Sequence, residues 1–347
     1  MSETRLAAAL SRRNAARPPV WFMRQAGRYH RHYQALRARH EFMELCKQPQ
    51  LAAEVTMGPI EEFGFDAAIL FSDLLFPLEA LGMGLSYVPG PRLAWYLRGT
   101  GDLERLRDPA QALAQLAFQG EAIRTLRPRL GAERALIGFV GGPITLYAYA
   151  VAGSHEGFSR GGLPGFEDGL YAGFCARLEE VLAGNMVLQA RAGADCIALF
   201  DTAAGALDAP RYAQLAVPPL ARVIERFRRS CPAVPLIYYS RDTGPEHWRS
   251  LEPLDLQCLG VDWRHDLADT LAAQSARWCL QGNLDPHWLL LEQSELERRV
   301  RAVFAKVAAL PAPVRAAWVC GLGHGVLPQT PESHVHAVLR IQREMFS

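Results

Sequence analysis

Several features that would place the chain in a broad class of protein are missing from its 347 residues. No run of about eighteen apolar residues occurs, so we expect no membrane-spanning helix. The N-terminal stretch also lacks the long apolar segment of a secretion signal. An arginine-rich start could serve as an organelle targeting segment, but strand-like sequence already begins at Pro19. We therefore expect a cytoplasmic protein.

The cysteines offer neither a disulfide framework nor a metal site. There are seven, an odd number, and they form no CxxC and no HxC pair. Four lie inside apolar runs, which is typical of small buried side chains in a reducing compartment. P-loop, HExxH and GxSxG motifs are absent as well, so the sequence predicts an activity without a metal or a nucleotide cofactor.

Acidic residues are absent from Arg5 to His40, a stretch that holds nine arginines. The net charge of the chain is only +1, so this positive charge is local. The chain as a whole does not have the charge of a protein that coats nucleic acid. Its densest part is MRQAGRYHRHYQALRARH at 23–40. Three interpretations are open: a solvated basic helix, a nucleic-acid or membrane surface, and one wall of an active site.

Short apolar runs of strand length alternate with longer segments of helical character. Because the runs are continuously apolar, they predict strands buried on both faces, as in a parallel sheet covered by helices. The eight predicted strands are 19–23, 66–71, 135–140, 195–200, 234–239, 256–261, 276–281 and 316–321. Eight strand–helix units without a break in composition predict an α/β fold, a single-domain (β/α)8 TIM barrel over 1–347. An open doubly wound sheet is the alternative, but no GxGxxG follows a strand.

The segments between the strands refine this prediction. We expect crossover helices within 166–193 and 294–310, and an N-terminal arm or helix at 1–18. Residues 83–105 predict a hairpin and loop inserted after the second strand, and the glycine-rich 153–165 predicts a mobile loop over the site. Polar, glycine-bearing sequence follows every predicted strand, and in a barrel those ends meet on the face where active sites lie.

Arg24 and Arg28 are four residues apart with a glycine between them, just past the first strand. On a loop turning into a helix, both could grip carboxylates through paired hydrogen bonds. The solvated start of a basic helix explains the spacing equally well, so both interpretations stay open.

Four other side chains have both a functional and a structural interpretation. Asp73, at a strand end, is either a helix N-cap or a carboxylate acceptor in an apolar pocket. Tyr149 lies among aromatic residues at helical spacing that usually belong to a core, and Thr202 could satisfy backbone groups. His324 stands between two glycines, which would let the backbone approach a ligand closely. A tight turn is the alternative there.

Five ordered motifs resemble the uroporphyrinogen decarboxylase family, from Pro19 to the C-terminal end. They are PVWFMRQAGRY (19–29), AAILFSDLLFPLEALGMG (67–84), IGFVGGPITL (137–146), LQGNLDP (280–286) and LGHG (322–325). The resemblance implies a single (β/α)8 barrel, a homodimer, no cofactor, and a cyclic tetrapyrrole substrate with eight carboxylates. It also implies substrate contacts from Arg24, Gln25, Ala26, Gly27, Arg28, Asp73, Tyr149, Thr202 and His324.

The same resemblance implies roles for the four residues that we expect to be catalytic. Arg24 binds carboxylates near the proton-transfer step, and Asp73 accepts pyrrole N–H groups and stabilises a cationic intermediate. Tyr149 and His324 lie beside the reacting acetate and the propionates. Which group delivers the proton stays open.

The chain departs from the family at four places. It has RYHRHY at 28–33 where RYLPEY is common, and Ala203 replaces a histidine after Thr202. Arg241 takes the place of a lysine after the fifth strand, and Gly321 that of an asparagine. We expect each departure to touch the substrate face.

Two other functions stay open. A cobalamin-linked methyltransferase of the same superfamily would bind zinc through an HxC pair, which the chain lacks. A tetrapyrrole-binding protein without turnover would explain the departures but not the presence of Asp73, Tyr149 and His324. We expect a decarboxylase with a small-molecule substrate and no nucleic-acid or membrane partner.

Overall fold

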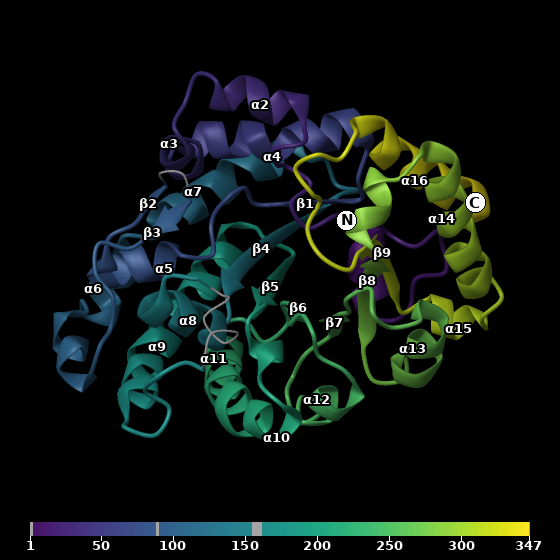
Figure 1. Cartoon of the computed structure of the whole chain (residues 1–347). Coiled ribbons are helices and arrows are strands. Elements are labelled where there is room, and N and C mark those ends of the chain that lie inside the picture. Colours follow the sequence, from purple (N-terminus) through teal and green to yellow (C-terminus); the bar gives the residue numbers. More distant parts are fainter. Residues whose placement is uncertain (1–2, 88–89, 155–161, 347) are drawn as a thin grey trace.

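A curved, parallel, seven-stranded sheet forms the centre of the molecule, as a computed structural model shows for residues 3–87, 90–154 and 162–346 (Figure 1). Neighbouring strands follow chain order, and every residue of these strands is buried because helices cover the outside. The strands are β1 (Ala67–Ile69), β4 (Ala135–Gly141), β5 (Cys196–Phe200), β6 (Leu236–Tyr239), β7 (Cys258–Gly260), β8 (Cys279–Leu284) and β9 (Trp318–Leu322). Each lies at a predicted strand.

The remaining predicted strand, 19–23, closes the barrel as a single parallel bridge between Val20 and Cys320. The Cys320 N–H donates to the Pro19 carbonyl at 2.8 Å, and the Asp66 N–H donates to the Val20 carbonyl at 2.9 Å. This extended segment therefore lies between β9 and the start of β1. It is shorter than predicted because the chain turns at Arg24, whose φ is +61°. With it, the fold is the expected (β/α)8 barrel.

Helices surround the sheet, and the longest, α9, fills the predicted crossover at 166–193 (Figure 1). It ends at Gly193, whose φ of +118° stops the helix without strain. The helices before α9 are α1 (Arg5–Leu10), α2 (Arg31–Arg37), α3 (Phe42–Lys47), α4 (Pro49–Phe63), α5 (Phe76–Leu78), α6 (Pro109–Ala114), α7 (Ala117–Leu126) and α8 (Pro143–Ala152). The rest are α9 (Leu170–Ala192), α10 (Ala209–Arg211), α11 (Val217–Ser230), α12 (Pro245–Arg249), α13 (Leu267–Gln274), α14 (Gln293–Ala308), α15 (Ala312–Arg315) and α16 (Glu332–Met345).

The predicted insertion at 83–105 contains a short antiparallel hairpin. Its strands are β2 (Ser86–Tyr87) and β3 (Pro91–Arg92), and a 3-10 helix, η2 (Thr100–Arg105), follows. The predicted N-terminal arm contains α1, which Thr4 caps by accepting the Ala7 N–H. Of the loop predicted at 153–165, residues 155–161 lie outside the described residues.

The cysteines confirm the prediction made from their spacing. All seven are free and buried, so they act as small core side chains. No helix in the described part of the chain is long and apolar enough to cross a membrane.

Candidate active site

The predicted site residues lie just beyond the carboxyl ends of the strands, on one face of the barrel. Arg24 and Arg28 lie in the turn after the 19–22 segment, and Asp73 follows β1. Tyr149 lies in α8 after β4, and His324 follows β9. Four different strand–helix units thus contribute to this face, as expected for a barrel active site.

Arg24 is the electrostatic centre of this group. Burial of Arg24 lowers the pKa of its guanidinium, and the nearby charge of Arg28 lowers this pKa further. Tyr149 and Asp73 oppose this lowering of the Arg24 pKa, so both lie within electrostatic reach of the guanidinium. Arg24 is nevertheless accessible to solvent. A ligand can therefore reach its guanidinium.

Neither Arg24 nor Arg28 forms an ion pair with an acidic residue in the part of the chain that the structure describes. Of the other seven arginines in the stretch, Arg5, Arg13, Arg17 and Arg31 do, and Arg12, Arg37 and Arg39 donate to main-chain carbonyls instead. Two adjacent, accessible guanidinium groups without a protein carboxylate can receive carboxylates of a ligand.

The turn that carries these arginines adds main-chain donors. Within the described residues, the N–H groups of Ala26 and Gly27 have no acceptor, and both residues are half-buried. Gln25 differs, because its side chain is engaged within the protein. Its Oε1 accepts the Phe22 N–H at 3.1 Å, and its Nε2 donates to the Ala67 carbonyl at 3.0 Å. The side chain of Gln25 therefore fixes the turn to β1 and gives no support to its expected substrate contact.

Asp73 forms a local turn bond but does not cap α5, whose N-cap residue is Leu75, and its role as a carboxylate acceptor for a ligand stays a prediction. Its Oδ1 accepts the Leu75 N–H at 2.8 Å, a local turn bond like that of a cap. Desolvation raises its pKa above the ordinary value, whereas Tyr87 and Arg24 hold the rise back. The side chain is half-buried, and the desolvation that raises its pKa means that little water surrounds the carboxylate.

The inserted hairpin places Tyr87 beside Asp73, a neighbour that was not predicted. The Asp73 charge raises the Tyr87 pKa in addition to the effect of burial, although the pair lacks the geometry of a regular hydrogen bond. The Tyr87 ring packs on that of Phe42, with centroids 4.4 Å apart. The sole signal in the sequence was an insertion directly after the strand that leads to Asp73.

Tyr149 owes its position to a buried carboxylate under the start of α8. The Thr145 N–H donates to Oδ1 of Asp201 at 2.7 Å, and the Thr145 Oγ1 accepts the Ala203 N–H at 3.0 Å. Burial raises the pKa of Asp201 to about 6. A Cβ at Gly142 would come within 2.3 Å of the Asp201 side chain, which explains a glycine in the GGP motif.

Thr202 follows Asp201 and is half-buried, but no described contact connects its side chain to Arg24 or Asp73. Its expected role stays a prediction. Ala203, one of the departures from the family, is buried within the Asp201–Thr145 arrangement.

His324 stacks on Tyr239 at the end of β6, with ring centroids 5.9 Å apart and an interplanar angle of 15°. The Tyr239 hydroxyl donates to the Gly323 carbonyl at 2.8 Å and so holds the loop. The two glycines around His324 are needed for packing within the protein, and the expected approach of a ligand stays a prediction. Cβ atoms there would come 2.5 Å from the Trp263 nitrogen at Gly323, and 2.5 Å from Cδ of Arg24 at Gly325.

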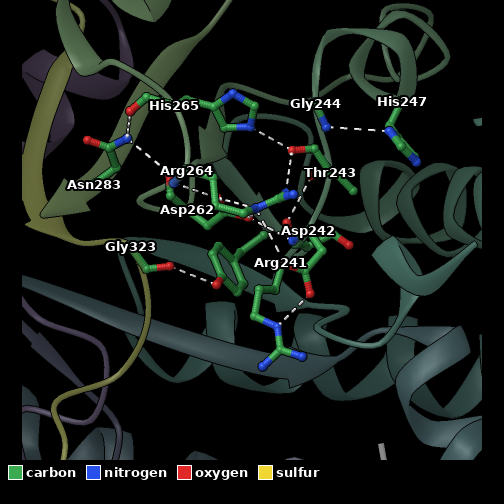
Figure 2. Close-up of polar contacts among 12 residues, drawn as sticks. Arg241, Asp242, Thr243, Gly244, His247, Asp262, Arg264, His265, Asn283 and Gly323 are labelled. Carbon is green, nitrogen blue, oxygen red and sulfur yellow. Dashed lines mark hydrogen bonds and ion pairs between the residues drawn. The ribbon is translucent and has the colours of Figure 1, made fainter. Parts of the chain in front are cut away.

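A polar network fixes the neighbouring loops after β6, β7 and β8 (Figure 2). Buried Asp262 accepts the Asp242 N–H at 2.7 Å and binds the Arg264 guanidinium at 2.9 Å. Asn283 donates to the carbonyls of Asp262 and His265 at 2.9 and 2.8 Å. The Asp242 bond links the loop after β6 to the loop after β7, and the Asn283 bonds link that loop to β8, so the rim of this side of the barrel is held in one arrangement.

The HRH sequence at 30–32 faces other helices, and the expectation that it touches the substrate face is wrong. His30 is buried, with Nε2 3.8 Å from Oε1 of Glu332, and Arg31 binds Glu332 at 2.7 Å. His32 packs on Gly58 so closely that a Cβ there would come 2.4 Å from its ring. These three side chains attach α2 to α4 and to the first residue of α16.

Gly321 is also a packing position. It is buried, and a Cβ would come 2.7 Å from Nε2 of Gln281. For metal binding, the described residues contain no group of three or more His, Cys, Asp or Glu that could hold an ion.

Comparison with known proteins places the chain in one family. The model of the family described as uroporphyrinogen decarboxylase (URO-D) matches residues 1–345. A uroporphyrinogen decarboxylase from Roseiflexus sp. (strain RS-1) is 36% identical over 99% of both chains. One from Trichlorobacter lovleyi is 37% identical over 91% of both chains. A solved structure of a methyltransferase from Methanosarcina mazei superposes with a TM-score of 0.77 over 99% of this chain and 98% of that chain. The two sequences are 18% identical, so this is a likeness of fold alone.

Proposed function

Since the chain belongs to the uroporphyrinogen decarboxylase family, we propose that it removes the four acetate carboxyl groups of uroporphyrinogen III as CO₂ and releases coproporphyrinogen III. One observation carries the proposal. Arg24 is accessible, has no acidic ion-pair partner among the described residues, and lies within electrostatic reach of a second accessible arginine, Arg28, and of the desolvated Asp73. The substrate has the complementary features, with carboxylates around its rim and pyrrole N–H groups at its centre.

The reaction needs a place for the electron pair that CO₂ leaves behind. Protonation of a pyrrole ring carbon next to the acetate makes the ring an iminium-like acceptor, so the substrate itself supplies the electron sink. The bond from the acetate methylene to its carboxyl carbon then breaks, and its electrons enter the ring. A proton added to the methylene carbon gives the methyl group, and loss of the ring proton restores the pyrrole. Each turnover therefore consumes one proton and releases one CO₂.

Asp73 is the residue that supports the cationic ring in this scheme. It accepts pyrrole N–H groups, and its negative charge stabilises the protonated intermediate more strongly because little water surrounds it. The raised pKa of Asp73 reflects the same desolvation. Arg24 and Arg28 bind the carboxylates, and the charge of Arg24 partly offsets the rise that burial causes in the Asp73 pKa.

The other expected residues complete the binding surface. The free N–H groups of Ala26 and Gly27 can donate to a carboxylate beside the arginines. Tyr149 and His324 position the reacting acetate or carry protons, and Thr202 offers a hydroxyl from the loop after β5.

The experiment is anaerobic incubation of the purified chain with uroporphyrinogen III, followed by oxidation and separation of porphyrins by carboxyl number. We expect products with seven to four carboxyl groups, in amounts that match the CO₂ released. Heat-denatured protein is the control. Folded protein that binds the substrate and releases no CO₂ would refute the proposal and favour a binding protein without turnover.

We also propose a cytoplasmic homodimer, for which the support is the family resemblance. Sedimentation equilibrium would test the assembly: a mass near twice 38.4 kDa supports it, and a mass of one chain at micromolar concentration contradicts it.

A further inference from the structure

Arg241 is a basic residue at the end of β6 whose charge is only partly used within the protein. Its side chain is 34% exposed, and its Nε donates to Oδ2 of Asp242 at 2.9 Å. Neither of its Nη groups has an acceptor among residues 3–87, 90–154 and 162–346. The bidentate edge of this guanidinium is therefore available to a ligand.

The nearby Arg264, by contrast, has its guanidinium bound by acceptors within the protein. Its Nε and Nη2 bind buried Asp262, and Nη2 also donates to the Thr243 carbonyl at 3.2 Å. Figure 2 shows the Arg264 guanidinium inside this network, whereas that of Arg241 points away from it. Asp242, the partner of Arg241, is itself fixed because its N–H donates to Asp262.

The strand order places Arg241 across the barrel from Arg24 and Arg28. Going round the barrel from the 19–22 segment, the next strands are β1, β4, β5 and β6. In a ring of eight, the first and fifth members are opposite each other. Arg24 and Arg28 follow the first member and Arg241 follows the fifth, so cations stand on opposite sides of one opening.

Tyr239 and His324 lie between these cations. Burial raises the pKa of Tyr239, and Arg241 and Arg24 both counter the rise, so both charges act on this one phenol. The main chain of Arg241 also packs on the loop after β5, where a Cβ at Gly205 would collide with the Arg241 carbonyl. Arg241 thus borders the candidate site on a rigid part of the rim.

We propose that Arg241 is a specificity-determining residue that binds a carboxylate side chain of the substrate on the side of the barrel opposite Arg24 and Arg28. The inference rests on the proposed function. A macrocycle with carboxylates around its whole rim needs cations on opposite sides to be held across the opening. A structural pair with Asp242 alone would contribute little, because an accessible ion pair adds little to stability and leaves the Nη edge unused.

The test compares Arg241→Gln and Arg241→Lys with the wild type in the anaerobic decarboxylation assay. Arg249→Gln is the matched control, because Arg249 lies in the following helix α12, is exposed and has no described side-chain partner. We expect Arg241→Gln to raise the KM for uroporphyrinogen III roughly 10-fold or more, as for a lost charged hydrogen bond, with kcat within about 3-fold. Arg241→Lys should recover part of the KM, since it keeps the charge without the bidentate edge.

Equilibrium dialysis of coproporphyrinogen III gives a readout without turnover, and its Kd should rise in Arg241→Gln if the bound carboxylate is a propionate. An unchanged Kd with a raised KM assigns an acetate, which also supports the proposal. Wild-type KM and Kd in a folded Arg241→Gln variant would overturn it while the proposed function stands. An inactive wild type would refute both the role of Arg241 and the proposed function. A lowered melting temperature in Arg241→Gln and Arg241→Lys, together with an unchanged KM, would assign Arg241 a structural role and refute its role in binding.

Discussion

The side chain of Arg24 lies directly against the backbone of Gly325, so the first and the last loop of the barrel meet at the guanidinium stem. A Cβ at Gly325 would come 2.5 Å from Cδ, 2.8 Å from Cγ and 3.0 Å from Nε of Arg24. These atoms are the middle of the side chain, and moving them moves the charged group. Gly325 therefore sets where the cation points.

We predict that Gly325→Ala displaces Arg24 and lowers kcat/KM about 10-fold or more, because a shift of about 1 Å in a positioning group has large effects on rate. The melting temperature should change little, since the arginine can yield into solvent. Steady-state kinetics check this. Gly99→Ala is the control, because a Cβ there meets nothing within 4 Å, and equal kinetics in the two variants would contradict the assigned contact.

Asp73→Asn should keep the shape of the site and remove the charge that supports a protonated pyrrole. We expect kcat to fall by about 100-fold or more, as for loss of one electrostatic stabiliser in a site with little water. Asp269→Asn, at an exposed position of α13, should leave turnover unchanged. Near-normal kcat in folded Asp73→Asn would remove Asp73 from the mechanism.

Tyr87→Phe tests the contact that the inserted hairpin makes with Asp73. The phenol lowers the pKa of Asp73, so its removal should raise that pKa further. Activity requires the carboxylate, and it falls as pH drops through the Asp73 pKa. The acid limb of the kcat/KM profile should therefore move to higher pH in the variant. Tyr96→Phe, elsewhere in the insertion, should show the wild-type profile, and an unmoved acid limb in Tyr87→Phe would refute the contact.

Asp201 gives a pH dependence of stability with an unusual sign. Its folded pKa of about 6 lies above the ordinary 3.8, so the folded protein binds the extra proton more tightly than the unfolded chain. This carboxyl therefore contributes stability at low pH that is lost as pH rises from about 4 to about 6, an effect of ~3 kcal/mol.

Asp201→Asn should remove this dependence, so its free energy of unfolding relative to wild type should improve by ~3 kcal/mol between pH 4 and pH 7. Urea unfolding at several pH values measures the difference. Asp266→Asn should show the opposite trend, because hydrogen bonding to Lys306 lowers the Asp266 pKa. Parallel pH curves for the two variants would contradict the assignment.

The barrel was predictable because strands buried on both faces leave uninterrupted apolar runs in the sequence. The 19–23 run was also apolar, but its pairing is limited to Val20 because the backbone turns at Arg24. Local hydrophobicity determines which segments are buried. It does not determine where a turn ends the hydrogen-bonded pairing of two strands.

The placement of Arg24, Asp73, Tyr149 and His324 on one face was predictable because polar residues after barrel strands share one face, whereas their roles stay predictions. Tyr87 was not, since its place depends on how the hairpin folds back over the loop after β1. Tyr239 lay inside an apolar run and its ring is indeed buried, so nothing in the sequence distinguished its hydroxyl contact with Gly323.

The extra positive charge at 30–32 was misassigned for a related reason. Composition shows that a segment is basic, but only the packed structure shows that Arg31 binds Glu332 and that His32 lies on Gly58.

The bridge between Val20 and Cys320 has a consequence for how the protein is made. The two residues are 300 positions apart in the chain. Because a ribosome adds roughly 5–20 residues per second, Val20 is synthesised roughly 15–60 s before Cys320. Arg24 follows the 19–22 segment, which is made early, and Gly325 follows β9, which is made late. A nascent chain can therefore bury most of its strands during synthesis, but Arg24 reaches its final position only when the loop after β9 has been made.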